Sequence, residues 1–305
     1  MKEIIVPVVA PLKQDLSLDR EAVRRIFMFL HENHACPFIL GTTGEAASLS
    51  KSFRDEYLEV AAESKAEGQH WYVGVSSNIL EESISISQQA HRLGVTAIAA
   101  TLPTYYQLSV YQMERYFMQL ADACSAGLIV YNIPATTHMS LPLDLIERLS
   151  KHENIVGIKD SERNMERLQD SLNRWSDRED FKHYIGWAGA AGFALLNGSS
   201  GVVPSTGNFA PSVYVQMCEA AERQDVGLVK MMQKQSDELG NLYQANKSLG
   251  ESLWALKVLM KELGLCEEYM MPPLNSLGDK ERQEILRGFH ELINNQHIKL
   301  TSSHV

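Results

Sequence analysis

The sequence predicts an α/β fold of the (β/α)8, or TIM, barrel type with a C-terminal helical appendage. Short β-rich runs alternate eight times with longer amphipathic stretches, at a spacing of roughly 25–35 residues. Several of these runs are apolar without alternation, as expected of parallel strands that are covered on both faces. Strand patterns stop after about Ser212. An open doubly wound sheet is the alternative, but no Gly-x-Gly-x-x-Gly motif follows a strand, which disfavours its dinucleotide-binding version.

Eight runs are expected to form the strands of the barrel. They cover residues 4–9, 38–40, 71–75, 96–100, 128–131, 155–158, 183–185 and 201–203. Helices are expected to begin at 17–19, near Ser50, near Leu80, near Ser109, after Pro142 and at Asn164, and further helices at 212–224, 226–246, 251–263 and 279–294. Ser17, Ser50 and Ser109 are the expected N-caps, because their hydroxyls can accept from amides of the first turn. We divide the chain into a barrel, residues 1–225, and a C-terminal helical domain, residues 226–305.

The composition is that of a globular protein with an acidic surface. Of its 305 residues, 45% are apolar, which is enough for a large core and argues against disorder. The 38 acidic and 28 basic residues give a net charge of −10. An acidic chain has no general attraction to phosphate backbones, so nucleic-acid binding is disfavoured as the main role.

The cysteines and the hydropathy pattern indicate a cytoplasmic protein. Cys36, Cys124, Cys218 and Cys266 are far apart and form no CxxC pair, which disfavours a zinc knuckle or a disulfide scaffold. No apolar run approaches the ~18 residues of a membrane span. The first apolar stretch is interrupted by Pro7 and is too short for a signal peptide. We therefore expect neither a membrane nor a metal partner.

Lys159 is the candidate nucleophile of this sequence. It closes the apolar run 155–158, and the carboxyl ends of barrel strands are where catalytic residues stand. A lysine that faces the mouth of a barrel loses water, and this loss favours the neutral amine. A neutral amine attacks carbonyl carbons and forms a Schiff base. The ordinary alternative is a solvated lysine at a strand edge.

Two further strand ends carry polar groups. Tyr131 ends the preceding strand, so its phenol could lie beside Lys159 and relay protons, although it could equally be a core tyrosine. The turn 41–44 offers two threonine hydroxyls and backbone N–H groups that could hold a carboxylate. A plain strand–helix loop is the more common explanation of such a turn.

Three motifs, each at a predicted strand end, together resemble one enzyme family. They are Gly41-Thr42-Thr43-Gly44-Glu45, Tyr131-Asn132-Ile133-Pro134 and Gly157-Ile158-Lys159-Asp160-Ser161. In order and spacing they are similar to the dihydrodipicolinate synthase / N-acetylneuraminate lyase family, and the similarity includes 103–106, 201–205 and 271–274. The resemblance implies a pyruvate-dependent class I aldolase or lyase with a TIM barrel, a C-terminal helical domain and a tetramer built from tight dimers.

The resemblance also implies roles for individual residues. Lys159 would form the Schiff base with pyruvate, and Tyr131 would be the acid and base. Thr43 would link Tyr131 to Tyr106, which would reach across from the neighbouring subunit, and Thr42 and Thr43 would hold the pyruvate carboxylate. The remaining substrate-binding positions are Gly186, Thr136, Val203 and Ser205. No metal or organic cofactor is implied, because the protonated imine is itself the electron sink.

Two positions depart from the family and bear on the second substrate. Thr136 stands where dihydrodipicolinate synthases carry an arginine that binds the carboxylate of the aldehyde, and a hydroxyl cannot replace a bidentate cation. Trp187 and Ala188 follow Gly186 where sialic-acid lyases use acidic residues to bind sugar hydroxyls. We therefore expect a second substrate that is smaller or more apolar than in those enzymes.

Three other functions stay open on the sequence alone. Activity as a 4-hydroxy-tetrahydrodipicolinate synthase of lysine biosynthesis would need another cation, and Arg163 is the first candidate. A hydro-lyase or deaminase would use the same imine to expel water or ammonia. A non-catalytic sensor of 2-oxo acids is the alternative from a different class. It is disfavoured because ligand binding alone requires neither a nucleophile nor a proton relay.

Overall fold

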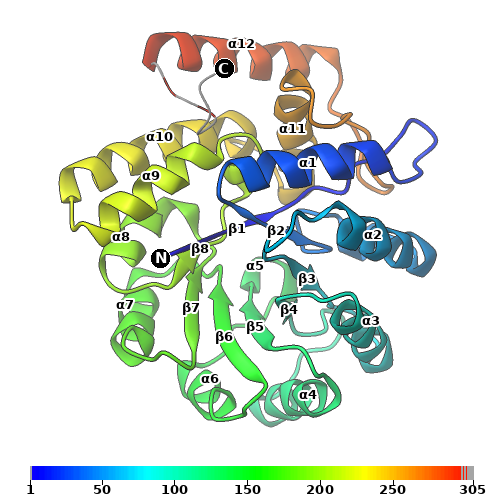
Figure 1. Ribbon diagram of the computed structural model, residues 1–305, viewed down its shortest axis with the longest axis vertical. Helices are drawn as coiled ribbons and strands as arrows, with labels where there is room; N and C mark the ends of the chain where they lie inside the picture. The colour runs from blue at the N-terminus through cyan, green and yellow to red at the C-terminus, as the bar shows by residue number, and fades with distance from the viewer. Residues whose placement is uncertain (1, 297, 299, 301–305) are drawn as a thin grey trace.

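Eight parallel strands close into a barrel in the order of the sequence (Figure 1). The computed structural model describes residues 2–296, 298 and 300. The strands in this part of the chain are β1 (Glu3–Pro7), β2 (Cys36–Ile39), β3 (Tyr72–Gly74), β4 (Ala97–Ala100), β5 (Leu128–Asn132), β6 (Ile155–Asp160), β7 (Lys182–Ile185) and β8 (Gly201–Val202). The predicted TIM barrel and its strands are thus confirmed. The open sheet is wrong, because β1 also pairs with β8.

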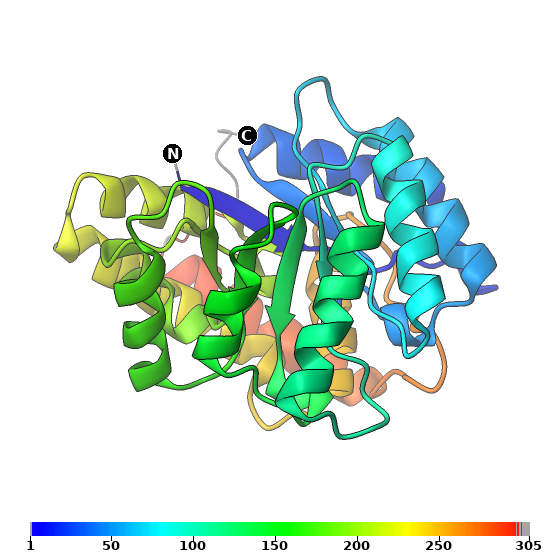
Figure 2. The ribbon, with the colours of Figure 1, turned by 90° about the horizontal axis from the view of Figure 1, so that it is seen from below.

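Helices enclose the strands on the outside of the barrel (Figure 2). Those between the strands are α1 (Arg20–Glu32), α2 (Lys51–Ser64), α3 (Leu80–Arg92), α4 (Val110–Ala123), α5 (Pro134–Thr137), α6 (Leu143–Leu149), α7 (Met165–Trp175) and α8 (Ala191–Leu196). After the last strand come α9 (Pro211–Glu222), α10 (Val226–Gln244), α11 (Leu249–Glu262) and α12 (Asp279–Gln296). Short 3-10 turns are η1 (Ala46–Ser48), η2 (Ala188–Ala190) and η3 (Ser205–Asn208). Within the described residues, none of these helices combines the length and apolarity that a membrane crossing requires.

Two of the three predicted N-caps are confirmed and one is wrong. The hydroxyls of Ser50 and Ser109 accept from backbone amides in the first turns of α2 and α4. Helix α1 begins later than expected, and its cap is Asp19, whose carboxylate accepts from an amide of the first turn at 3.0 Å. Ser17 instead donates its hydroxyl hydrogen to Asp15 at 2.6 Å within the preceding loop. A carboxylate caps a helix as well as a hydroxyl does, so Asp19, which directly precedes α1, serves as the cap in place of Ser17.

The interior of the barrel is filled by its own side chains. The buried residues that pack together there are Ile5, Phe38, Tyr72, Ala97, Ala99, Ile129, Tyr184 and Val203. At the amino end of the strands, the Glu3 carboxylate accepts hydrogen bonds from the hydroxyls of Tyr72, at 2.7 Å, and Tyr184, at 2.5 Å. The packed interior leaves the carboxyl ends of the strands as the place for a site, as is usual for this fold.

The last three helices, α10, α11 and α12, lie on one side of the barrel, in the upper part of Figure 1. Helix α10 packs against α8 and α9 of the barrel and against α11 and α12. This arrangement brings residues of α10 and α11 next to the loops that follow β6, β7 and β8. The predicted helical appendage is therefore present, and it is packed on the barrel rather than separated from it.

A buried ion pair joins α11 to the loop after β2. Lys257 Nζ lies 2.5 Å from a carboxylate oxygen of Glu45, and both side chains are completely buried. Lys257 also donates to the carbonyl oxygen of Tyr269 at 2.6 Å, and the Met271 amide donates to the second Glu45 oxygen at 2.8 Å. Glu45 has a φ of +54°, in the left-handed region, so this contact holds an unfavourable backbone conformation in place. The ion pair thereby ties the turn 41–45 to the C-terminal helices.

Removal of one partner of this ion pair is expected to be strongly destabilising. Lys257→Met leaves the Glu45 carboxylate buried without its cation, which typically costs about 3–5 kcal/mol of unfolding free energy. The double variant Lys257→Met with Glu45→Gln should recover a large part of that loss. Chemical denaturation measures both values. Lys261→Met is the matched control, because this lysine of α11 pairs with Glu267 at the surface and should contribute no more than about 1 kcal/mol. Equal effects of the two single variants would contradict the expectation.

Candidate active site

Lys159 and Tyr131 lie side by side at the carboxyl ends of two neighbouring strands. They are directly opposite one another in the pairing of β5 with β6. Lys159 is only 5% exposed, and its Nζ lies 3.8 Å from the centre of the Tyr131 ring and 4.9 Å from the centre of the Phe38 ring. Both Lys159 and Tyr131 line a cavity of about 940 Å³. The structure thus brings the candidate nucleophile and the candidate proton donor together in one cavity.

The surroundings of Lys159 change the protonation of both groups. Burial lowers the pKa of Lys159 from its ordinary value of 10.5, because the ammonium form has lost its water, and the nearby Tyr131 only partly opposes this shift. Burial by itself would raise the pKa of Tyr131. The charge of Lys159 and hydrogen bonds from Thr42, Lys159 and Ser161 outweigh that effect, so the pKa of Tyr131 is lowered. Each group therefore influences the protonation of the other.

The turn after β2 presents its two threonines to the cavity in different ways. Thr42 Oγ1 lies 3.5 Å from the hydroxyl of Tyr131. The resemblance had implied this contact for Thr43 rather than for Thr42. The conformation of the turn decides which of the two hydroxyls faces β5, and strand periodicity does not predict that conformation. Thr43 is buried and lines the cavity. Within the described residues, the amide N–H groups of Thr42 and Thr43 have no hydrogen-bond acceptor, so both can bind an anion.

The remaining predicted site residues divide into two groups. Gly186, Val203 and Ser205 line the cavity. Thr136 does not belong to the lining, and its hydroxyl donates to a backbone carbonyl of its own turn at 3.4 Å. Tyr106 is 72% exposed and lies outside the lining, with its ring against Tyr105 and without a contact to Thr43 in the described chain.

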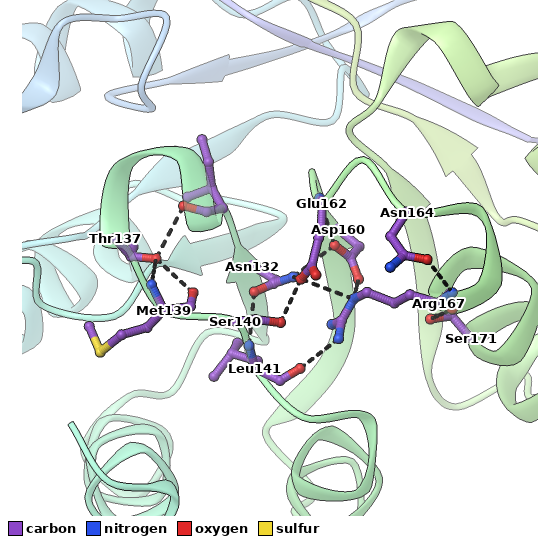
Figure 3. A network of polar contacts seen from close by, with 11 residues as sticks. Asn132, Thr137, Met139, Ser140, Leu141, Asp160, Glu162, Asn164, Arg167 and Ser171 are labelled. Carbon is purple, nitrogen blue, oxygen red and sulfur yellow. Dashed lines mark hydrogen bonds and ion pairs between the residues drawn. The ribbon is translucent and has the colours of Figure 1, made fainter. Parts of the chain in front are cut away.

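A polar network lies at the ends of β5 and β6, next to Tyr131 and Lys159 in the chain (Figure 3). The Asn132 amide donates to Asp160 at 2.9 Å and to Glu162 at 3.0 Å. Arg167 of α7 donates to Asp160 at 2.7 Å and to the carbonyl of Leu141 at 2.8 Å. These bonds join the ends of β5 and β6 to α7 and fix the two strands that carry the catalytic candidates. Asn132 and Asp160 stand next to those candidates in the motifs, but no sequence pattern pointed to Arg167.

Helix α10 supplies a wall of the cavity that the sequence analysis missed. Its polar contributors are Ser236, Asp237, Asn241 and Gln244, and Lys247 follows directly after the helix. These residues recur at helical spacing in the sequence. That spacing could have identified a polar face of the helix, but it could not have shown that this face lines the cavity. The expectation of a smaller or more apolar second substrate rested on Thr136 and on Trp187 with Ala188. It did not take into account the polar side chains that α10 adds to the cavity, and it stays a prediction.

Comparisons with known proteins give the family. The model of the dihydrodipicolinate synthetase family matches residues 1–291. A 4-hydroxy-tetrahydrodipicolinate synthase of Neisseria meningitidis is 30% identical over 276 residues, which are 90% of this chain and 93% of that protein. The dihydrodipicolinate synthase structure from Bacteroides thetaiotaomicron has a TM-score of 0.89 at 27% identity, and covers 95% of this chain and 98% of its own.

A more distant structure shares the fold. The sialic acid aldolase of Ruminococcus gnavus, solved as a catalytic lysine mutant, has a TM-score of 0.88 at 20% identity and covers 98% of both chains. The match to the family model extends over nearly the whole chain and includes every strand that lines the cavity. The chain therefore belongs to the dihydrodipicolinate synthetase family, and it is a carbon–carbon lyase of the class I aldolase type that works through a lysine Schiff base.

Proposed function

We propose that the chain cleaves or forms a carbon–carbon bond next to a pyruvate-derived imine on Lys159. The observation that carries this proposal is the buried amine of Lys159, which lies 3.8 Å from the centre of the Tyr131 ring inside the cavity. The neutral amine attacks the carbonyl carbon of pyruvate and water leaves, which gives an imine. Loss of a proton from the methyl carbon gives an enamine, which adds to the carbonyl carbon of an aldehyde. The reverse sequence releases the aldehyde.

The other residues of the site take roles that follow from their positions. Tyr131 donates and accepts the protons of imine formation and carbon–carbon cleavage, since its phenol lies beside the amine. Thr42 holds the Tyr131 hydroxyl at 3.5 Å, and the amides of Thr42 and Thr43 bind the carboxylate of pyruvate. Gly186, Val203 and Ser205 shape the pyruvate end of the cavity. Ser205 is oriented by Tyr243, whose hydroxyl lies 2.6 Å from its own.

The alternative function is that of a 4-hydroxy-tetrahydrodipicolinate synthase, and the name of the Neisseria relative favours it. That reaction condenses pyruvate with an aldehyde that carries a carboxylate. At residue 136 a threonine hydroxyl bonded within its own turn replaces the arginine of the synthases, so this position offers no cation. The same imine chemistry would also serve a hydro-lyase or a deaminase.

We further propose a cytoplasmic homotetramer built from tight dimers. Tyr105, Tyr106 and Tyr111 are exposed large aromatic residues near one another in the chain, which is typical of a surface that a partner covers. In such a dimer Tyr106 would approach Thr42 of the neighbouring subunit. All four cysteines are unpaired, as in proteins of a reducing compartment.

Borohydride reduction in the presence of pyruvate is expected to label Lys159. The reduced imine adds a stable pyruvyl group to Nζ, which peptide mass spectrometry locates. Lys159→Ala should remain folded and take up no label. Labelling of a different lysine, or no labelling at saturating pyruvate, would overturn the proposed function.

Tyr131→Phe is expected to lower kcat at least ~100-fold, the usual scale for loss of a positioned proton donor. The variant keeps the ring that packs on Lys159 and removes only the hydroxyl. Single-turnover measurement of pyruvate imine formation tests the step directly. Tyr269→Phe is the matched control, because this tyrosine does not line the cavity and only its backbone carbonyl, which the variant keeps, bonds to Lys257. A normal rate in Tyr131→Phe would assign the proton transfers to another group.

Lys159→Met is expected to raise the melting temperature by a few degrees at pH 7. The pKa of Lys159 is lowered in the folded protein, so the unfolded chain binds the proton more tightly. This cost to folding is complete below the folded pKa and disappears as the pH rises through the unfolded value of 10.5. The difference in melting temperature should therefore narrow toward pH 10. The exposed Lys151→Met serves as the control, with no pH-dependent difference. A less stable Lys159→Met at pH 7 would show that the buried amine is not a cost.

A further inference from the structure

Arg163 places a cation without a partner on the wall of the cavity. It lies four positions after Lys159 in the loop that leads from β6 to α7, and its side chain is exposed and lines the cavity. Within the described residues it forms no hydrogen bond and no ion pair, unlike Arg167 in the helix that follows, which is bound to Asp160. A free guanidinium on the wall of a substrate cavity is available to an anion of the substrate.

Two other charged side chains of the lining, Glu162 and Lys247, already have partners. The Glu162 carboxylate accepts from Asn132 and from Ser140, at 3.0 and 2.6 Å, and lies 3.4 Å from Arg167. Lys247, the second cation in the lining after Lys159, is paired with Glu281 at 2.7 Å. Among the described residues of the lining, Arg163 therefore remains as the cation of the outer part of the cavity that has no partner.

Asp237 is the acid on another wall of the cavity. It belongs to α10 and accepts from Gln233 at 2.7 Å. Burial raises its pKa, with Glu238 contributing in the same direction. The Asp237 carboxyl group can accept hydrogen bonds from hydroxyl groups of a ligand. It has no positive charge with which to bind a carboxylate. Arg163 and Asp237 therefore offer different groups to one substrate.

The size of the cavity calls for a long substrate. Its volume of about 940 Å³ lies near the upper end of the ~300–1,000 Å³ of ordinary ligand pockets, and a three-carbon acid fills only its inner end. On the basis of the proposed function, we infer that the second substrate carries an anionic group, most simply a carboxylate, and that Arg163 binds it. In the aldol adduct this group stands at the end of the chain distant from the imine. The adduct is thus a 2-oxo acid with a distal carboxylate.

Imine trapping on Lys159 tests this inference without knowledge of the natural aldehyde. The probes are 2-oxoglutarate, 2-oxoadipate and 2-oxopimelate, and each is compared with the monocarboxylic 2-oxo acid of the same chain length. Borohydride reduction at increasing probe concentration, read by intact mass, gives a half-saturation concentration for each acid. The ratio between the two members of a pair isolates the effect of the distal carboxylate. Pyruvate is the reference ligand in every series.

For the wild-type protein, the half-saturation concentration of the diacid is expected to be about tenfold lower than that of the monoacid at one or more chain lengths. Arg163→Gln should bring this ratio close to one, and Arg163→Lys should keep part of it, because the charge remains and the planar fork is lost. Arg92→Gln is the matched control, since this exposed arginine ends α3 at the opposite face of the barrel, and it should keep the wild-type ratio.

Two results would overturn the inference while leaving the proposed function intact. One is that pyruvate labels the protein efficiently while the diacids label it no better than the monoacids at any chain length, including the case in which none of the long acids labels it. The other is a preference that persists in Arg163→Gln. Absence of pyruvate labelling in the wild-type protein is a different result, and it would remove the proposed function together with the inference that rests on it.

Discussion

The burial of one lysine amine is the constraint on which the site depends. Lys159 ends an apolar strand inside a packed barrel, and loss of water favours its neutral form. Such a group costs folding free energy, so the surroundings must supply the rest of the stability. The aromatic rings of Tyr131 and Phe38 pack near Nζ, and the register of β5 and β6 keeps Lys159 in place. The same burial that costs stability makes the amine a nucleophile, which links the energetics of the barrel to its chemistry.

Two buried ionic networks fix the loops around that amine. Behind β5 and β6, Asp160 is held by Asn132 and Arg167, so the strand ends that carry Tyr131 and Lys159 cannot separate. Beneath the turn after β2, Glu45 is held by Lys257 of α11. Buried pairs of this kind add little net stability over apolar packing, but loss of one partner is costly. Their effect here is to hold the catalytic candidates of two strands and a turn in one arrangement.

The C-terminal helices contribute to the site as well as to the fold. Helix α10 forms a polar wall of the cavity, and α11 holds the turn whose amides are proposed to bind a carboxylate. The barrel therefore supplies the imine chemistry, whereas the outer wall and the loop with Arg163 are proposed to bind the second substrate. This division explains how one barrel accommodates different aldehydes, since loops and appended helices can change while the strand ends remain.

The sequence by itself determined the features that depend on local periodicity and on strand order. Apolar runs located the strands, and the fixed neighbourhood of successive parallel strands placed Tyr131 beside Lys159. Only the tertiary structure decided which threonine of the turn faces Tyr131, because a turn has no periodicity that sets the direction of its side chains. It also decided that Lys257 meets Glu45, that Arg167 meets Asp160 and that α10 lines the cavity. These contacts join segments distant in the chain, and their geometry depends on how helices pack on the closed barrel, which no local pattern of residues encodes.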